Sequence, residues 1–469
     1  MTNWIVCSSC LGNGKKKQKS KKNNKLSLND TKNIQIAKHL NKTDLSSTKY
    51  ILCKKCNGLG ILMSDEPINA DTNIFPHVAI IGLGIAGVTL AVACLHRGIP
   101  FSIFERDTYF SQRSQGYGLT LQQASKITNA LGISNFENGI VSTKHIVFDT
   151  NGTVLGSWGK RKWLSNENEK STKKTNLHIA RQELRLKLID QLNENKNIFW
   201  NHRLVDLKSD INTGNELTFL VNGEKKVVQS DLIVGADGIR SIVQNKLFQN
   251  KNPLKYLGCI VILGICELDK LAYLNSELLD SETVFQTANG NERIYVMPYS
   301  KKQIMWQLSF PMQECDAISL SKKGAHFLKN EAINRTKWHS PIPEIILNTE
   351  ISLITGYPVY DREALKTNLS LLNKPVTLIG DAAHPMSPFK GQGANQAMID
   401  GLHLARTIYL KYKFNDLKKI NIREAVLNQF ETEMFERSNI KVNESAQAAI
   451  FLHTEAVLNV SDQPRRKIE

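Results

Sequence analysis

A strand, a glycine-rich turn and a helix follow one another near residue 80, and this succession constrains the fold most. Residues 77–81 (HVAII) form an apolar, β-branched run, and residues 82–87 read Gly-Leu-Gly-Ile-Ala-Gly. Helical spacing continues to Leu95, and a second strand-like run ends at Glu105, eighteen residues beyond Gly87. Such glycines let a diphosphate approach a helix N-terminus, and an acid about 20 residues further on binds the adenosine ribose. The pattern predicts a dinucleotide site made by Gly82, Gly84, Ala86, Gly87, Glu105 and Arg106.

A second turn of the same kind lies between residues 380 and 401. The preceding run 375–379 (PVTLI) predicts a buried strand, and helical spacing returns after Gln392. The glycines and prolines in between suit a place where backbone passes close to a ligand. The free amides of the following helix could hold an anion or the edge of a ring, whereas the alternative is an ordinary glycine-rich turn.

Residues 380–395 (GDAAHPMSPFKGQGAN) closely resemble the Gly-Asp motif of the group A flavoprotein monooxygenases, the class of para-hydroxybenzoate and salicylate hydroxylases. The resemblance implies that Asp381 binds the ribityl hydroxyls of FAD. It also implies that Pro388 and Gly391 form the environment of the flavin face and ring edge, with no acid–base residue assigned. The backbone that would face the pyrimidine edge comprises Gly391, Gly393, Ala394 and Asn395. His384 is expected to be structural.

Two more segments agree with this resemblance. Residues 230–241 (SDLIVGADGIRS) resemble the family's Asp-Gly motif, which would place Asp237 near the FAD diphosphate. Arg113 precedes Gly-Tyr-Gly-Leu and Arg181 opens an amphipathic helix, at positions where the family's arginines contact the cofactor. Taken singly, such an arginine is more often a surface charge.

The resemblance implies that NADPH or NADH reduces the FAD, and that O2 is then activated as a flavin hydroperoxide to hydroxylate a small aromatic or polycyclic substrate. No second Gly-x-Gly-x-x-Gly occurs in the sequence, so the nicotinamide cofactor would bind without a nucleotide fold of its own. The enzymatic alternatives are a tetracycline-inactivating type of oxygenase and a flavin-dependent reductase. The non-enzymatic alternative is an inactive flavoprotein that serves as a zinc-knuckle interaction module.

The expected fold class is α/β, with a Rossmann-like FAD-binding domain of the glutathione-reductase type into which a mainly antiparallel β-sheet domain is inserted. The FAD-binding domain is predicted at 76–142, 177–247 and 373–412, and the substrate-binding domain at 143–176 and 248–372. Residues 413–469 are expected to form a C-terminal helical segment whose polar tail, after Val460, frays. One face of a hairpin at 293–310 should line the substrate pocket. Its candidate side chains are Tyr295, Met297, Trp306, Gln307 and Phe310.

Four of the eight cysteines form two Cys-x-x-Cys-x-Gly-x-Gly patterns, at 7–14 and 53–60. Two such knuckles supply the four thiolates that tetrahedral zinc prefers. The pattern resembles the cysteine-rich zinc repeats of DnaJ-type chaperones, although that family has four repeats and this chain has two. A small zinc-ribbon-like module is therefore predicted at 1–66, with a thiol-redox pair or unliganded cysteines as alternatives. Its proposed ligands are Cys7, Cys10, Cys53 and Cys56.

The net charge of +16 is concentrated near the N-terminus. Residues 1–76 carry thirteen lysines and five acids, and the lysine-rich stretch 15–25 cannot bury a core. We therefore expect a solvated segment and consider a nucleic-acid partner unlikely. No run is apolar enough for a signal peptide or a membrane span, which predicts a cytoplasmic protein. The oligomeric state is left open.

Overall fold

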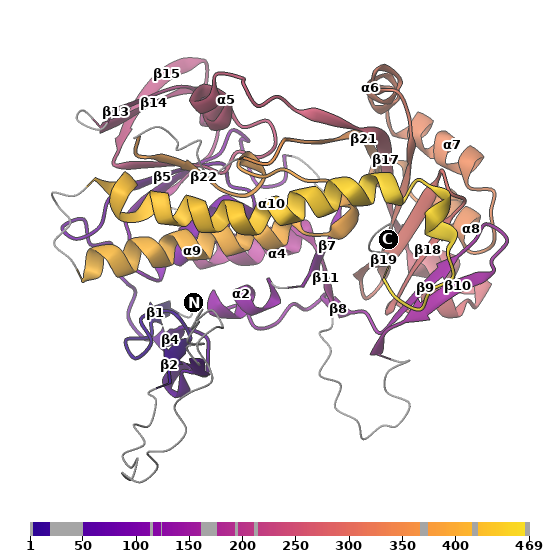
Figure 1. Ribbon diagram of the computed structural model, residues 1–469, viewed down its shortest axis with the longest axis horizontal. Coiled ribbons are helices and arrows are strands. Elements are labelled where there is room, and N and C mark those ends of the chain that lie inside the picture. The colour runs from indigo at the N-terminus through magenta and orange to yellow at the C-terminus, as the bar shows by residue number, and fades with distance from the viewer. Residues whose placement is uncertain are drawn as a thin grey trace, which may run out of the picture.

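The computed structural model describes residues 3–18, 50–112, 116–122, 124–160, 176–192, 196–210, 214–365, 374–414 and 421–464. It has the expected mixed α/β fold, with a parallel sheet, a large antiparallel sheet and two long helices that lie along the molecule (Figure 1). Among the helices in these ranges, none combines the length and apolar character needed to cross a bilayer.

A five-stranded parallel sheet, in the order β12-β6-β5-β16-β22, forms the centre of the cofactor-binding part. All four strand pairs are parallel. The strands are almost wholly buried, as in a sheet that is covered on both faces. They are β5 (Val78–Ile81), β6 (Phe101–Phe104), β12 (Ile198–Phe199), β16 (Leu232–Gly235) and β22 (Val376–Leu378).

Two helices that follow strands of this sheet pack tightly on each other. α1 (Ile85–Leu95) follows β5, and α9 (Gly393–Lys413) follows β22. A side chain at Gly401 of α9 would place its Cβ 2.8 Å from the backbone nitrogen of Leu90 in α1, so the helices need glycine at this crossing. α10 (Asn428–Phe451) packs on α9 with its apolar face (Figure 1).

Smaller elements surround this layer. A three-stranded antiparallel meander consists of β13 (Arg203–Asp210), β14 (Gly214–Val221) and β15 (Glu224–Ser230). A second three-stranded sheet consists of β7 (Gly118–Leu121), β8 (Ile140–Val141) and β11 (Leu177–Ala180). The short helices here are α2 (Ser125–Ala130), α4 (Arg181–Ile189) and α5 (Ile242–Phe248).

A seven-stranded sheet in the order β10-β9-β18-β19-β20-β17-β21 forms the other large layer. It is antiparallel except for the β18–β9 pair. One face is covered by α6 (Glu314–Lys322), α7 (Ala325–Arg335) and α8 (Ile342–Asn348), at the right of Figure 1. The strands are β9 (Lys144–Phe148), β10 (Val154–Trp158), β17 (Lys255–Glu267), β18 (Thr283–Ala288), β19 (Arg293–Ser300), β20 (Gln303–Pro311) and β21 (Ile354–Asp361).

The N-terminal cysteine pairs lie in two small antiparallel ribbons below α9 in Figure 1. β1 (Asn3–Val6) pairs with β4 (Ile61–Ser64), and β2 (Lys15–Lys17) pairs with β3 (Tyr50–Leu52). Most of the lysine-rich stretch falls outside the described ranges.

The C-terminal segment differs from the sequence-based expectation in one respect. The amide of Ser461 donates to the carbonyl of Leu155, and the Asp462 carboxylate accepts from the amide of Ser157. Residues 461 and 462 are therefore held against the edge strand β10 and do not fray, while residues 465–469 of the predicted tail lie outside the described ranges. The expectation failed because the polar composition of this segment does not reveal an unpaired strand edge far away in the sequence.

Candidate functional site

A cavity of about 1600 Å³ lies between the parallel sheet and the seven-stranded sheet. It is larger than the ~300–1,000 Å³ of a typical single-ligand pocket, so it has room for a long cofactor and a second molecule. Its walls include the glycine turn at Gly84, the Gly-Asp loop at Asp381 and Pro388, and the strands around Tyr295. The sequence-predicted cofactor and substrate segments thus meet at one cavity.

The first glycine turn shows why glycine occurs at each of its positions. A Cβ on Gly82 would lie 2.6 Å from the carbonyl oxygen of Ala236, where the ends of β5 and β16 meet. A Cβ on Gly87 would lie 1.9 Å from the carbonyl oxygen of Gly82. At Gly84 the nearest atom would be Nη2 of Arg181 at 3.9 Å, so the missing side chain leaves open space in the cavity. Gly82 and Gly87 therefore serve packing, and Gly84 serves access.

Glu105 stands at the end of β6, as predicted, but its carboxylate already has protein partners. Oε2 accepts from the amide of Leu83 at 2.9 Å, and Oε1 accepts from the amide of Asp107 at 3.1 Å. A carboxylate has acceptor capacity beyond two hydrogen bonds, so a ribose hydroxyl could still donate to it. Arg106 is exposed and is not among the residues that line the cavity.

Asp381 lies in the Gly-Asp loop and presents its surface to the cavity. Removal of the Asp381 carboxylate from bulk water raises its pKa, while the nearby charges of His384 and Arg181 oppose this shift. The guanidinium of Arg181 lies 5.3 Å from the ring centre of Tyr117, and its Nη1 is buried without a hydrogen-bond partner among the described residues. The cavity wall therefore contains a buried, unpartnered donor near both loops.

A buried charge network that sequence reasoning missed holds the Gly-Asp loop. The carboxylate of Asp400 in α9 accepts from the amide of Gly380 at 2.9 Å, from Nε2 of His384 at 2.7 Å and from Nη2 of Arg437 at 2.6 Å. Burial alone would raise the pKa of Asp400, but the charges of His384 and Arg437 and these hydrogen bonds keep it below its ordinary value. The network fixes the start of the loop to both long helices. It also gives His384 the structural role expected for it.

The loop before α9 is tied to β7 by the side chain of Asn395. Its amide group donates to the carbonyls of Thr120 and Gly391, and its Oδ1 accepts from the amides of Gln122 and Ala124. Gly391 has a φ of 58°, the left-handed conformation that favours glycine. Asn395 is therefore fully used in holding the loop, so any contact with a ligand here would come from backbone amides. Pro388, Gly391, Gly393 and Ala394 all line the cavity.

Two predicted site residues, Asp237 and Arg113, are not among the described residues that line the cavity. Oδ2 of Asp237 accepts from the amide of Ile242 at 2.7 Å, which places that oxygen at the start of α5. Its Oδ1 is buried without a partner in the described part of the chain, and burial raises its pKa. The cavity wall nearby is formed by Ala236 and Gly238. Arg113 lies outside the described residues.

The hairpin of β19 and β20 presents one face to the cavity. Tyr295, Met297 and Gln307 line the cavity, as predicted. Trp306 and Phe310 point to the opposite face and are fully buried against α6–α8, so these two candidates do not line the cavity. The alternation along a strand makes one of the two sets face inward, but the sequence does not say which set.

Arg293 is a cavity residue that sequence reasoning missed. It is only 5% exposed, and its Nε donates to Oε1 of Gln286 at 2.8 Å. Its guanidinium lies 4.8 Å from the ring centre of Tyr295. No salt bridge to Arg293 occurs within the described ranges. An arginine in a strand of apolar pattern was the available signal, because a buried charge needs a partner.

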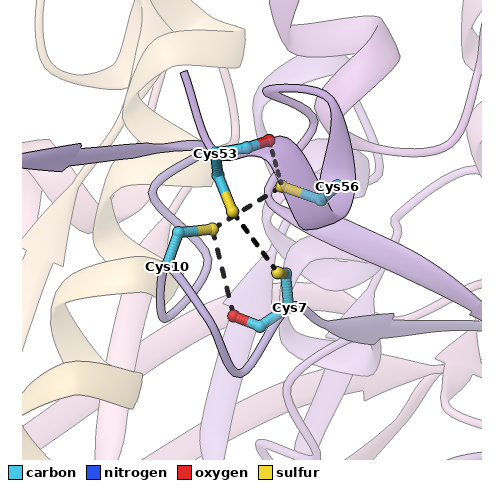
Figure 2. Close-up of side chains that lie close together, drawn as sticks. All are labelled: Cys7, Cys10, Cys53 and Cys56. Atoms are coloured by element: carbon cyan, nitrogen blue, oxygen red, sulfur yellow. Dashed lines mark hydrogen bonds between the residues drawn. The ribbon is translucent and has the colours of Figure 1, made fainter. Parts of the chain in front are cut away.

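The four N-terminal cysteines form a compact, buried cluster (Figure 2). The sulfur–sulfur distance is 3.9 Å for Cys7 and Cys53 and 3.7 Å for Cys10 and Cys56, and all four sulfurs lie within 4.8 Å of one another. Four sulfurs around one zinc ion, with Zn–S bonds of ~2.3 Å, would be about 3.8 Å apart. The amides of Gly14 and Gly60 each donate to a cysteine sulfur at 3.2 Å. The arrangement could hold a tetrahedral metal ion.

Comparisons with known proteins agree with this geometry. Residues 76–415 match the family described as FAD binding domain. The chain is 27% identical over 365 residues to an aurachin C monooxygenase/isomerase of Stigmatella aurantiaca, which covers 77% of this chain and 86% of that protein. It is 25% identical over 363 residues to Monooxygenase 1 of Arabidopsis thaliana, and the alignment covers 74% of this chain and 84% of that protein.

Solved structures share the fold. HpxO of Klebsiella pneumoniae, complexed with FAD and uric acid, superimposes with a TM-score of 0.67 at 17% identity, over 82% of this chain and 91% of that one. The 2,6-dihydroxypyridine-3-hydroxylase of Arthrobacter nicotinovorans gives a TM-score of 0.64 at 17% identity, over 84% and 98%.

The residues around the cavity fit FAD. The open space at Gly84 leads past the unpartnered Nη1 of Arg181 to Asp381 and to the amides that begin α9. These groups suit a diphosphate, a polyol chain and the edge of a ring, in that order. The geometry and the match over most of its length lead to one conclusion: the chain belongs to the FAD binding domain family.

Proposed function

We propose that this protein is an FAD-dependent monooxygenase that uses NADPH or NADH and O2 to hydroxylate a small aromatic or polycyclic substrate with an acidic or hydrogen-bond-accepting group at one end. The observation that carries the proposal is the single cavity that joins the glycine turn, the Gly-Asp loop and the antiparallel sheet. The relatives named as monooxygenases support it.

In this proposal the bound FAD, once reduced, supplies the activated oxygen. The chain's own groups bind and orient the reactants and exclude water. Gly84 and Arg181 would bind the diphosphate end of FAD, and Asp381 the sugar chain. Pro388 and the backbone from Gly391 onward would position the ring edge beside the substrate.

The inward face of β19 gives the substrate site a direction. Met297 lies beside β7, because a Cβ on Gly118 would be 2.7 Å from the Met297 methyl carbon, and β7 is tied to the Gly-Asp loop. Arg293 lies four residues away on the same face, which is about 13 Å along a strand. Met297 and Arg293 therefore mark an apolar end and a cationic end of the substrate site. A substrate that contacts both ends must be longer than one ring.

Gln307 adds a polar group midway between Met297 and Arg293. The side-chain amide Nε2 of Gln307 is buried without a partner in the described ranges, and Gln307 is paired across the sheet with Tyr295. Together with Arg293 it offers donors to a carboxylate, an enolate or a carbonyl oxygen. Hydroxylation would take place at the opposite end of the substrate, near Met297.

We further propose that the cysteine cluster holds a structural zinc ion. Two sulfur–sulfur distances, 3.9 Å and 3.7 Å, match the ~3.8 Å expected around such an ion, all four sulfurs lie within 4.8 Å of one another, and all four cysteines are buried. A Cβ on Gly14 would lie 2.2 Å from the carbonyl oxygen of Gly58, and one on Gly60 would lie 2.5 Å from that of Gly12. The two knuckles therefore interlock only with glycine at these positions, which favours a built ligand set over unliganded cysteines.

The test is a comparison of purified wild-type protein with R293M, R293K and K441M. A yellow wild-type protein should oxidise NADPH or NADH faster with an acidic bicyclic phenol than with its neutral ester. R293M should raise the KM for the acid by about 10-fold or more, because a hydrogen bond to a charged group contributes ~1.5–3 kcal/mol. K441M is the control, since Lys441 lines the cavity but is paired with Glu444 at 2.9 Å. A colourless protein would refute the flavin function, and an unchanged KM in R293M would refute the substrate orientation.

A further inference from the structure

Two arginines, the buried Arg97 and the partly buried Arg406, lie between the cysteine cluster and the cofactor-binding part. Arg97 follows α1 and is 3% exposed, and Arg406 lies within α9. Nη1 of Arg97 donates to the carbonyl oxygen of Ala93 at 2.8 Å. Nε and Nη2 of Arg97 and Nε of Arg406 are buried and have no hydrogen-bond partner among the residues that the structure describes.

No carboxylate pairs with either guanidinium within those residues. The pKa of Arg97 is lowered to about 9, chiefly by burial and next by the positive charge of Arg406. The two cations therefore lie within electrostatic range of each other. Two like charges that are buried together destabilise a fold unless an anion offsets them.

The first knuckle of the cysteine cluster lies close to these arginines. A Cβ on Gly12, in the first knuckle, would lie 3.3 Å from Nη2 of Arg97. Cys10 lies within electrostatic range of Arg406. Zinc bound by four thiolates carries a formal charge of −2, which equals the sum of the two guanidinium charges in magnitude.

We propose that Arg97 and Arg406 are the counter-charges of the metal centre and that metal binding is therefore coupled energetically to the stability of the FAD-binding part. This inference rests on the proposed zinc site. Both arginines would stabilise the metal centre electrostatically, and neither lines the cofactor cavity. With the metal bound, the two cations lie beside a dianionic centre.

The packing of the module supports such coupling. A Cβ on Gly132, after α2, would lie 2.4 Å from Nε1 of Trp4, so the indole of the module's first strand lies directly on the cofactor-binding part. A freely tethered interaction module would not require glycine at this contact. The two arginines and the Trp4 contact both indicate one cooperative unit.

The experiment uses the full-length, FAD-loaded protein and the variants R406M, R97M and R406K, with R335M as the control. Arg335 is also a partly buried arginine, but it pairs with Glu292 and Glu331 far from the cluster. Zinc affinity is measured by competition with a colorimetric chelator. Unfolding is followed by the release of fluorescent FAD on heating, with and without chelator.

We expect R406M and R97M each to weaken zinc binding by about 10-fold, which corresponds to about 1.4 kcal/mol, with R406K close to wild type and R335M unchanged. Chelation should lower the FAD-release temperature of the wild type more than that of R406M. Should R406M not fold, the same comparison is made between C53S and C53S/R97M, where the double variant should be more stable than additivity predicts. Equal zinc affinities in R406M and R335M, together with equal effects of chelation, would overturn the coupling. A wild-type protein without zinc would overturn the metal site and this inference with it, while the flavin function would stand or fall separately on its own assay.

Discussion

Gly84 and Gly87 belong to the same six-residue turn, yet the structure predicts opposite effects for their replacement by alanine. A Cβ on Gly87 would lie 1.9 Å from the carbonyl oxygen of Gly82 and 3.3 Å from a methyl group of Ile80, so α1 must move away from β5. Overpacking against backbone costs about 3 kcal/mol, and the better helix propensity of alanine offsets ~1 kcal/mol of it. The remaining ~2 kcal/mol should lower the melting temperature of the apoprotein by roughly 4–8 °C.

At Gly84 the new methyl group meets no atom closer than 3.9 Å and projects into the cavity. The apoprotein of G84A should therefore melt within ~2 °C of the wild type, because the loss of glycine at a helix N-cap costs no more than about 1 kcal/mol. Its affinity for FAD should fall by about 10-fold or more, since the methyl group occupies the space where the diphosphate approaches.

The assay is differential scanning fluorimetry of the flavin-free proteins, followed by titration with FAD monitored by quenching of its fluorescence. We expect the apoprotein of G84A to be more stable than that of G87A. At a temperature where both are folded, G84A should show the greater loss of FAD affinity. If G84A melted as low as G87A, or if it bound FAD as tightly as the wild type, the separation of packing from access within this turn would be refuted.

Three further predictions test the surroundings of the site. D400N should lose about 3 kcal/mol of unfolding free energy in urea and release FAD more readily, and R437M should do the same, because either change breaks a buried ion pair. The pKa of Asp400 is lowered, because the neighbouring histidine and arginine outweigh the effect of burial. Its contribution to stability is therefore present above the unfolded pKa of ~3.9 and is lost as the pH falls through the folded pKa. The unfolding free energy of D400N should accordingly depend less on pH on the acid side than that of the wild type. Burial raises the pKa of Asp361 to about 6, so the contribution of this group to wild-type stability should be lost as the pH rises from 4 to 6. D361N should therefore melt at a higher temperature than the wild type at pH 7.5 but not near pH 4. The same difference in melting temperature at both pH values would contradict this. W306F should reduce stability without changing the KM for substrate and Q307L should change the KM, and the reverse result would show that the faces of β20 are assigned wrongly.

The parts of the site that the sequence predicted are those whose geometry is local. A strand, a tight turn and a helix follow within about 20 residues, so spacing predicted a dinucleotide site at 82–87 and a ligand-binding turn at 380–395, whereas the assignment of that turn to FAD came from resemblance. The cysteine pairs are a similar case, because each knuckle is eight residues long and the two had only to meet.

The parts that the sequence did not predict depend on contacts between distant segments. The backbone of Asn395 was predicted to face the ring edge, but the role of its side chain was not predicted: it holds β7, more than 270 residues earlier, and nothing in its own motif specifies that partner. The inward face of β19 and β20 depends on which side α6–α8 cover, which the alternation of residues leaves open. For the same reason Arg293 became recognisable as a cavity residue only when the helices had been placed.

The cofactor site and the metal module are connected by the same two helices. α1 begins at the glycine turn and ends just before Arg97, and α9 begins at the Gly-Asp loop and carries Arg406 about 20 Å further along. The two helices cross without space for a side chain at Gly401, so a shift of one helix must move the other. Both helices therefore present their N-terminal ends to the proposed FAD site and an arginine near the opposite end to the cysteine cluster. If the cluster loses its negative charge, the uncompensated cations act directly on the two elements that hold the cofactor, and release of FAD should be the first measurable consequence.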